Sequence, residues 1–146
     1  GGISMGDYEV VRELLEPRGA RVGHVAMQPG GPQATVVWEG LPVICFPGNP
    51  VSTQLSFEVF VAPLLRTVAG LPQAVRERRQ LSEAVVSVAG RRQFLRGRAA
   101  EGGRVVIASG PGSHLVAGLA ASDLLVIIPE DVTALNAGDD VETWAL

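Results

Sequence analysis

The sequence predicts an α/β region followed by a small, mostly β module, with the boundary near residue 71. In the first part, apolar residues recur at helical spacing in two segments, and strand-sized runs lie between them. In the second part, short apolar runs alternate with turn residues. The chain has 146 residues, 47% of them hydrophobic, which is enough for a packed core and excludes a disordered chain.

Composition and charge narrow the classes of function. No apolar run reaches the ~18–20 residues of a membrane helix, so we expect no membrane insertion. The formal net charge of −3 gives no general attraction to nucleic acid. All 12 basic residues are Arg, which excludes a lysine Schiff base or a lysine phosphate ligand. The single cysteine, Cys45, cannot form an internal disulfide, which indicates a reducing, cytoplasmic compartment.

The first helix follows a glycine-rich start. The chain opens with Gly1-Gly2-Ile3-Ser4, without an initiator Met or a signal-peptide pattern, so we expect it to be a fragment. Ser4 and Asp7 have the spacing of a capping box. Apolar residues behind them recur at helical spacing, which predicts a helix over 7–16 with Gly19 as a left-handed residue after it.

Strands joined by loops, and then a long helix, are predicted for the rest of the first part. The helix over 51–69 carries apolar residues on most of its surface, so we expect it to be largely buried, with a kink at Pro63. Residues 43–46 form a short, apolar strand of the buried kind. The other predicted elements are a strand over 21–27, a loop over 28–32 and a β segment over 35–38.

Turn signals divide the second part into short strands. Residues 101–104 read as a hairpin turn, and 114–121 as a short helical stretch. The predicted strands are 81–88, 94–100, 105–109, 124–128 and 141–146. The predicted core residues are Leu81, Val86, Val88, Leu95, Val105, Ile107, Leu125 and Ile127.

The segment from Pro47 to Ser52 joins the apolar strand to the long helix and is a candidate anion site. Asn49 suits the N-cap and Pro50 the first helical position, so the N–H groups of Val51 and Ser52 can point at an anion. The alternative is ordinary turn chemistry, because Pro, Gly and Asn are common in any such turn.

Three further segments carry weaker signals. In the opening loop, Asp7 and Glu9 can supply oxygens to Mg²⁺, or act as solvated acids beside a helix cap. The Gly-rich segment 110–114 can bind an anion or form a plain loop. The Arg-rich stretch 91–98 suits phosphate or carboxylate, or forms a solvated face balanced by nearby acids.

Five of these segments resemble, in order and spacing, the molybdopterin molybdenumtransferases, the family of bacterial MoeA and the E domain of gephyrin. The resemblance spans the whole chain. The segments are Gly1-Gly2-Ile3-Ser4-Met5-Gly6-Asp7-Tyr8-Glu9, Val25-Ala26-Met27-Gln28-Pro29-Gly30, Phe46-Pro47-Gly48-Asn49-Pro50-Val51-Ser52, the stretch from Gly90 to Gly97, and Gly112-Ser113-His114.

The resemblance implies a fold and an activity. Residues 1–71 would be the C-terminal half of a MogA-like, molybdopterin-binding α/β domain of three-layer αβα type, and 72–146 a C-terminal β-barrel-like domain. The family inserts molybdate into adenylated molybdopterin with release of AMP, requires Mg²⁺, and works as a homodimer. Site residues follow by position. The catalytic residues would be Glu9, Pro47 and Pro50, the metal ligands Asp7 and Glu9, and the substrate-binding residues Gly1, Gly2, Ser4, Gly6, Gly48, Asn49, Ser52, Arg91, Arg96 and Ser113.

One segment departs from the family pattern. Some members carry lysines at the positions of His24, Gln28 and Gly31, so anion binding here must depend on backbone N–H groups or on arginines elsewhere. Two alternatives to the enzyme therefore stay open: a non-catalytic scaffold or partner-binding module of the same fold, and nucleic-acid binding through 91–98, which the net charge disfavours.

Overall fold

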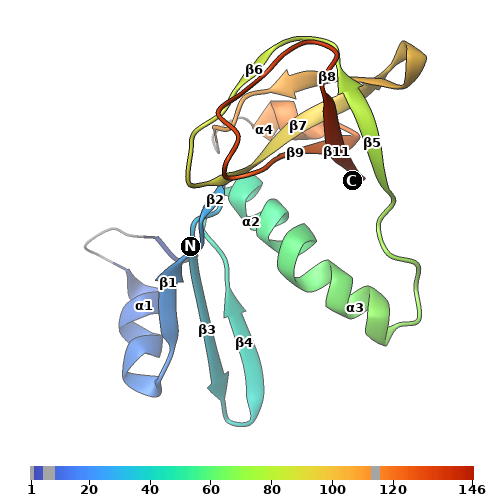
Figure 1. Cartoon of the computed structure of the whole chain (residues 1–146). Coiled ribbons are helices and arrows are strands. Elements are labelled where there is room, and N and C mark those ends of the chain that lie inside the picture. The colour runs from blue at the N-terminus through green and yellow to red at the C-terminus, as the bar shows by residue number, and fades with distance from the viewer. Residues whose placement is uncertain (1, 5–8, 113–115) are drawn as a thin grey trace.

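The computed structural model describes residues 2–4, 9–112 and 116–146. Its first part contains a three-stranded antiparallel sheet in the order β1-β3-β4, with a short helix beside it, and a long helix connects this part to a barrel of strands (Figure 1). The mixed α/β class is confirmed, whereas the three-layer αβα arrangement stays a prediction. Within the described residues, no helix has both the length and the apolar character needed to cross a membrane.

The first helix, α1 (Val10–Leu15), is shorter than the predicted span of 7–16, of which 7–8 lie outside the described residues. Its N-cap is Glu9, and a 3₁₀ turn, η1 (Glu16–Arg18), follows it. Gly19 then adopts φ 84°, which confirms the predicted left-handed residue.

The predicted strand 21–27 divides into two strands that belong to different sheets. β1 (Arg21–His24) pairs with β3 (Pro32–Trp38), and β2 (Met27–Gln28) pairs in parallel with β7 of the barrel. β4 (Leu41–Cys45) pairs with β3, but Ile44 is 44% exposed. The prediction of a fully buried strand is wrong there, because one face of this small sheet is not covered by other described residues.

The long helix is built from three segments: α2 (Pro50–Ser56), the π-helical η2 (Phe57–Val61) and α3 (Ala62–Val68). The π-helical turn ends at Ala62, whose N–H donates to the carbonyl of Phe57. Pro63 follows directly, and its ring cannot fit a regular α-turn. The prediction that the helix is largely buried is wrong for α3, where Val68 is 87% exposed. This half extends away from both sheets (Figure 1).

Five strands close the second part into a barrel. The sheet order is β2-β7-β8-β5-β11-β9, and β9 pairs back with β7. This agrees with the predicted β-barrel-like module, and closure leaves few exposed edges. The barrel strands are β5 (Arg76–Leu81), β7 (Arg92–Ala100), β8 (Arg104–Ser109), β9 (Leu124–Ile128) and β11 (Asp140–Ala145), and the small elements are β6 (Val85–Val86), η3 (Glu101–Gly103), α4 (Val116–Ala120) and β10 (Ala134–Leu135).

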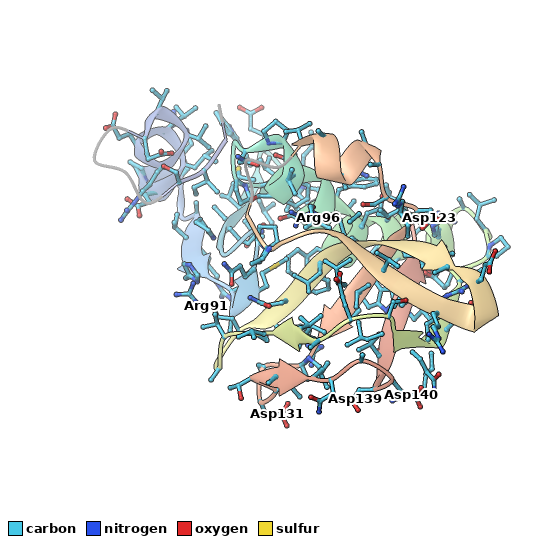
Figure 2. All side chains as sticks on the ribbon, turned by 90° about the horizontal axis from the view of Figure 1, so that it is seen from above. Arg91, Arg96, Asp123, Asp131, Asp139 and Asp140 are labelled. Carbon is cyan, nitrogen blue, oxygen red and sulfur yellow. The ribbon has the colours of Figure 1, made fainter. Side chains whose placement is uncertain are left out.

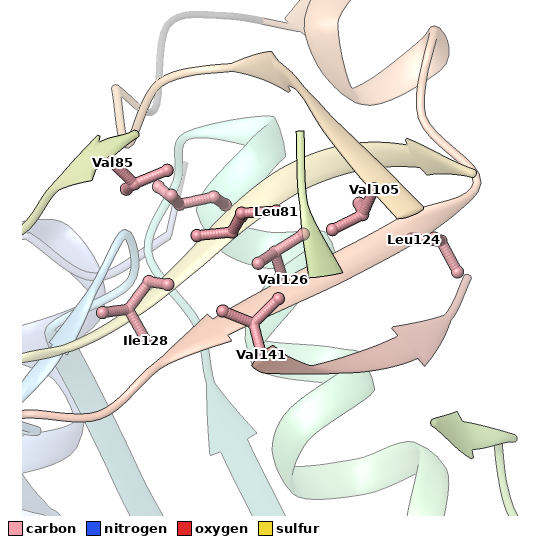
Figure 3. Close-up of a cluster of buried hydrophobic side chains, with 8 residues drawn as sticks. Leu81, Val85, Val105, Leu124, Val126, Ile128 and Val141 are labelled. Carbon is pink, nitrogen blue, oxygen red and sulfur yellow. The ribbon is translucent and has the colours of Figure 1, made fainter. Parts of the chain in front are cut away.

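The barrel interior holds one hydrophobic cluster (Figure 3). Gly97 of β7 belongs to its wall, because a Cβ there would lie 2.8 Å from Cγ2 of Val126. Of the predicted core residues, Val86 and Val88 are wrong, since they are 84% and 52% exposed. The predicted strand 81–88 is also misplaced, because 81 ends β5 and only 85–86 form a further strand. The buried cluster consists of Leu81, Val85, Leu95, Val105, Leu124, Val126, Ile128 and Val141.

β9 is buried on both faces and thereby joins the barrel to the first part. Leu125 and Ile127 point away from the barrel interior and pack with Val51 and Leu55 of α2. Phe94 belongs to the same cluster and meets Trp144 edge to face, with ring centroids 5.9 Å apart. This second core fixes the start of α2 against the barrel, which positions the loops described next.

Candidate functional site

A cleft of about 460 Å³ lies where loops of the first part meet the barrel. Its walls come from five stretches of the chain: 3–4, 24–32, 47–52, Arg91 and 111–112. Among the residues that the structure describes, no Asp or Glu lines the cleft, and the basic side chains that line it are Arg91 and His24. Figure 2 labels Arg91 at the side of the barrel that faces the first part.

The loop before α2 is held by its own side chains. Asn49 has extended backbone, and its Oδ1 accepts a hydrogen bond of 3.1 Å from the N–H of Val51, so the predicted N-cap is confirmed. The hydroxyl of Thr53 donates to the carbonyls of Pro47, at 2.5 Å, and of Asn49, at 2.9 Å. Ser52 is buried in the first turn and lines the cleft.

The opening loop lies directly on this turn. The N–H of Ile3 donates to the carbonyl of Phe46 at 2.9 Å, and Ile3 forms a parallel bridge with Pro47. A Cβ on Gly2 would lie 2.4 Å from the backbone N of Gly48, so a side chain there requires the loops to separate. The close contact of the two backbones places Ser4 in the cleft wall.

A third wall is the loop 28–32, which contains a cis Gln28–Pro29 bond. The side-chain NH₂ of Gln33 donates to the carbonyl of Gly30 at 2.8 Å and to Oγ of Ser56 in α2 at 2.7 Å. Gly30 has φ 105°, which favours glycine. These contacts tie the loop to the helix.

The floor contains an amide pair. Nε2 of Gln93, in β7, donates to Oε1 of Gln28 at 2.8 Å. Gln93 is buried, and Gln28 lines the cleft. The pair follows from the register of β2 and β7, in which these two residues are partners.

Arg96 acts differently from Arg91. It is fully buried, and its guanidinium donates to Oγ of Ser109 at 3.0 Å and to the carbonyls of Gly110 and Gly112, the latter at 2.9 Å. Burial lowers the pKa of Arg96. Arg96 therefore holds the loop that forms one cleft wall, and Figure 2 labels it near α4. Its direct contact with substrate stays a prediction.

Glu9 lies on the other side of the opening loop. Its carboxylate accepts hydrogen bonds from the N–H of Ser4, at 3.0 Å, and from the hydroxyl of Ser4. These bonds hold the pKa of Glu9 below its usual 4.5. Glu9 borders a separate hollow of about 310 Å³, together with Gly2, Ser4 and Gly48.

The described residues do not contain a cluster of protein ligands for Mg²⁺. Among them, no group of three or more His, Cys, Asp or Glu side chains could hold a metal ion. Both oxygens of Glu9 already accept hydrogen bonds from Ser4, and its predicted partner Asp7 lies outside the described residues. Mg²⁺ therefore stays a prediction.

The cleft brings together about half of the predicted site. Glu9 and Gly2 border the neighbouring hollow, and Pro50 is exposed at the first position of α2. Gly1, Gly6, Asp7 and Ser113 lie outside the described residues. The predicted residues that line the cleft are Ser4, Pro47, Gly48, Asn49, Ser52 and Arg91.

Sequence reasoning missed the residues that hold the walls: Thr53, Gln33 and Gln93. Thr53 carries a recognisable signal, because a Thr in the first turn of a helix can bond back to the preceding loop. Gln33 and Gln93 carry none, since their partners are distant in the sequence.

Two family models match the chain. Residues 1–67 match "Probable molybdopterin binding domain", and residues 78–146 match "MoeA C-terminal region (domain IV)". Molybdopterin molybdenumtransferase 2 of Mycobacterium tuberculosis is 41% identical over all of this chain and 38% of its own length. Molybdopterin molybdenumtransferase 1 of the same species is 36% identical over 97% of this chain and 36% of its own length.

Solved structures agree with these matches. A crystal structure of the molybdopterin biosynthesis MoeA protein from Pyrococcus horikoshii superimposes with a TM-score of 0.75 at 34% identity, covering 93% of this chain and 34% of that one. The chain thus spans less than two fifths of the length of these relatives. Matches to both domain models, together with this similarity along the whole chain, establish that the chain belongs to the molybdopterin molybdenumtransferase family.

Proposed function

We propose that the cleft is this chain's share of a molybdopterin-binding site, in which the complete protein inserts molybdate into adenylated molybdopterin and releases AMP. One observation carries the proposal: five segments, distant in the sequence, converge on one cleft, and none of its described lining residues is a carboxylate. Molybdate and the phosphates of the adenylated substrate are anions, so a lining without acidic groups suits them.

The lining supplies donors of several kinds. Arg91 brings a guanidinium, which suits phosphate. The N–H groups of the first helical turn lack partners within the helix, and Ser52 lies in that turn. Asn49 caps one of these groups, the N–H of Val51. In this proposal Pro47 and Pro50 fix the turn that presents these groups.

The proposal includes the remaining family expectations. We expect a division into domains 1–71 and 72–146, the first of three-layer αβα type in the complete protein, a homodimer, a cytoplasmic location and a Mg²⁺ requirement. No step is assigned to Mg²⁺ here. We expect the 146-residue chain alone not to catalyse the reaction.

AMP release from adenylated molybdopterin, with molybdate and Mg²⁺ present, tests the proposal in the complete protein that carries this chain. We expect Arg91→Ala and Ser52→Ala to lower turnover, and Arg104→Ala, an exposed arginine at the start of β8, to leave it unchanged. Normal turnover in a double Arg91→Ala, Ser52→Ala variant would contradict the assignment of the cleft. If the unaltered protein neither binds adenylated molybdopterin nor releases AMP, the scaffold alternative is favoured.

A further inference from the structure

The side-chain amide of Gln33 connects one wall of the cleft to the long helix. Gln33 lies on β3, and its NH₂ group donates to the carbonyl of Gly30 at 2.8 Å and to Oγ of Ser56 in α2 at 2.7 Å. Gly30 lines the cleft, whereas Gln33 and Ser56 do not. Gln33 therefore acts on the cleft only through the backbone that it holds.

The chemistry of the partners determines which end of this amide faces the loop. A carbonyl oxygen can only accept, so the NH₂ group of Gln33, and not its Oε1, must point to Gly30. Oε1 is buried, and within the described residues it has no hydrogen-bond partner. An unpaired buried acceptor costs free energy, which offsets part of the stabilisation by the two hydrogen bonds. Stability alone therefore gives no strong reason for a glutamine here.

Gln33 also fixes the direction of one peptide group in the cleft wall. Gly30 and Gly31 both line the cleft, and the peptide bond between them is trans, so its C=O and N–H point to opposite sides. The carbonyl is held on the side of Gln33, and the N–H of Gly31 has no hydrogen-bond partner within the described residues. Neither glycine has a Cβ to hinder rotation, so without Gln33 this peptide can turn over.

We propose that Gln33 is a positioning residue for substrate binding: its amide, aimed by Ser56, locks the Gly30–Gly31 peptide so that the N–H, and not the carbonyl, is available in the cleft wall. The inference rests on the proposed function and adds to it a residue outside the cleft lining on which substrate affinity depends. Loss of the lock should weaken substrate binding although no lining residue is altered.

Gln33→Met in the complete protein tests the inference, because methionine keeps the length of the side chain and removes both donated bonds. We expect the KM for adenylated molybdopterin in AMP release to rise about five-fold, which corresponds to a contribution of about one hydrogen bond. The value of kcat per folded protein should change little. A merely structural role would lower only the folded fraction and hence the apparent kcat. An unchanged KM would therefore overturn the proposal.

Gln73 provides a matched control at the other end of the long helix. Its NH₂ group also donates to a backbone carbonyl, that of Pro63 at 3.2 Å, and to a hydroxyl, that of Thr67 at 3.0 Å. Gln73→Met removes the same two kinds of hydrogen bond away from the cleft lining, so it should leave the KM unchanged. A rise in KM as large as that of Gln33→Met would overturn the assignment to the loop.

Ser56→Ala tests whether the hydroxyl and the amide act as one unit. Ser56 is 0% exposed, and its hydroxyl is the second acceptor of the Gln33 amide. Ser56→Ala should raise the KM less than Gln33→Met, because the bond to Gly30 can remain. It should add nothing once residue 33 is changed, since the two variants remove the same contact. Fully additive effects on the KM would overturn the lock.

The proposed function and this inference fail in different ways, which binding of adenylated molybdopterin, measured by calorimetry, separates from AMP release. If the unaltered protein binds this compound but releases no AMP, the proposed function is contradicted, and weaker binding by Gln33→Met still supports the lock. AMP release with a normal KM in Gln33→Met would contradict the lock and leave the proposed function intact.

Discussion

Asn49 has two roles that its side chain divides between two atoms. Its Oδ1 caps α2, and the residue lines the cleft, where its NH₂ group can donate to a ligand. Asn49→Ala removes both, so stability should fall by about 0.5–2 kcal/mol together with AMP release. Asn49→Asp keeps an acceptor for Val51 but loses the donor, so it should retain the melting temperature and lose activity. Loss of stability in Asn49→Ala, with normal activity in both variants, would show that Asn49 is a cap and not a site residue.

Glu9 gives the opening loop a pH-dependent anchor. Its pKa lies below the usual 4.5 because Ser4 donates two hydrogen bonds to the ionised carboxylate. A lowered carboxyl pKa contributes stability that is complete above 4.5 and disappears as the pH falls through the lowered value. Glu9→Gln should therefore melt below the unaltered protein at pH 7, and the difference should shrink at lower pH. A difference that grows on acidification would contradict this anchor.

At the scale of elements, the sequence predicts best where one physical signal dominates. The Asn49–Pro50 helix start, Gly19 and the hairpin turn at 101–103 are local, and the structure contains them. β5 was missed because four of its six residues are charged. Its stability comes from pairing with β11, where Arg78 lies opposite Glu142 and Arg76 covers the ring of Trp144 at 4.2 Å. Such pairing cannot be predicted from the sequence of one strand alone, because it depends on the residues of the neighbouring strand.

β9 shows the limit of periodicity most clearly. Its five residues are all apolar, so no alternation indicates which face enters the barrel. Leu124 lies in the barrel core and Leu125 in the cluster with α2. Both Leu124→Ala and Leu125→Ala should therefore destabilise the fold by about 2–5 kcal/mol, measured by chemical denaturation. Leu64→Ala, at a position 63% exposed, is the matched control and should have little effect. A near-neutral Leu125→Ala would mean that the contact with α2 contributes little.

At the scale of the whole molecule, the candidate site exists because segments of both parts form its walls and because β2 of the first part pairs with β7 of the barrel. The loop segments were predictable one by one from Gly, Pro and Asn patterns, and the family resemblance placed them in one site. Their supports were not predictable, because Gln28 and Gln93 are 65 residues apart and meet only through the parallel pairing of β2 with β7. The donor character of the cleft is thus a property of the assembled chain.

The connection between the parts offers a test of this shared structure. Residues 71–75 lie between α3 and β5, mostly exposed and outside any strand, so limited proteolysis should cut there first. The two pieces should nevertheless stay together, because β2 pairs with β7 and the apolar contacts of Val51 and Leu55 with β9 survive the cut. Gel filtration of the cut chain without denaturant should give one species that contains both pieces, and denaturant should separate them. A first cut within β7 or β9 would contradict the compact barrel, and spontaneous separation would show that the second core is too weak to hold the cleft.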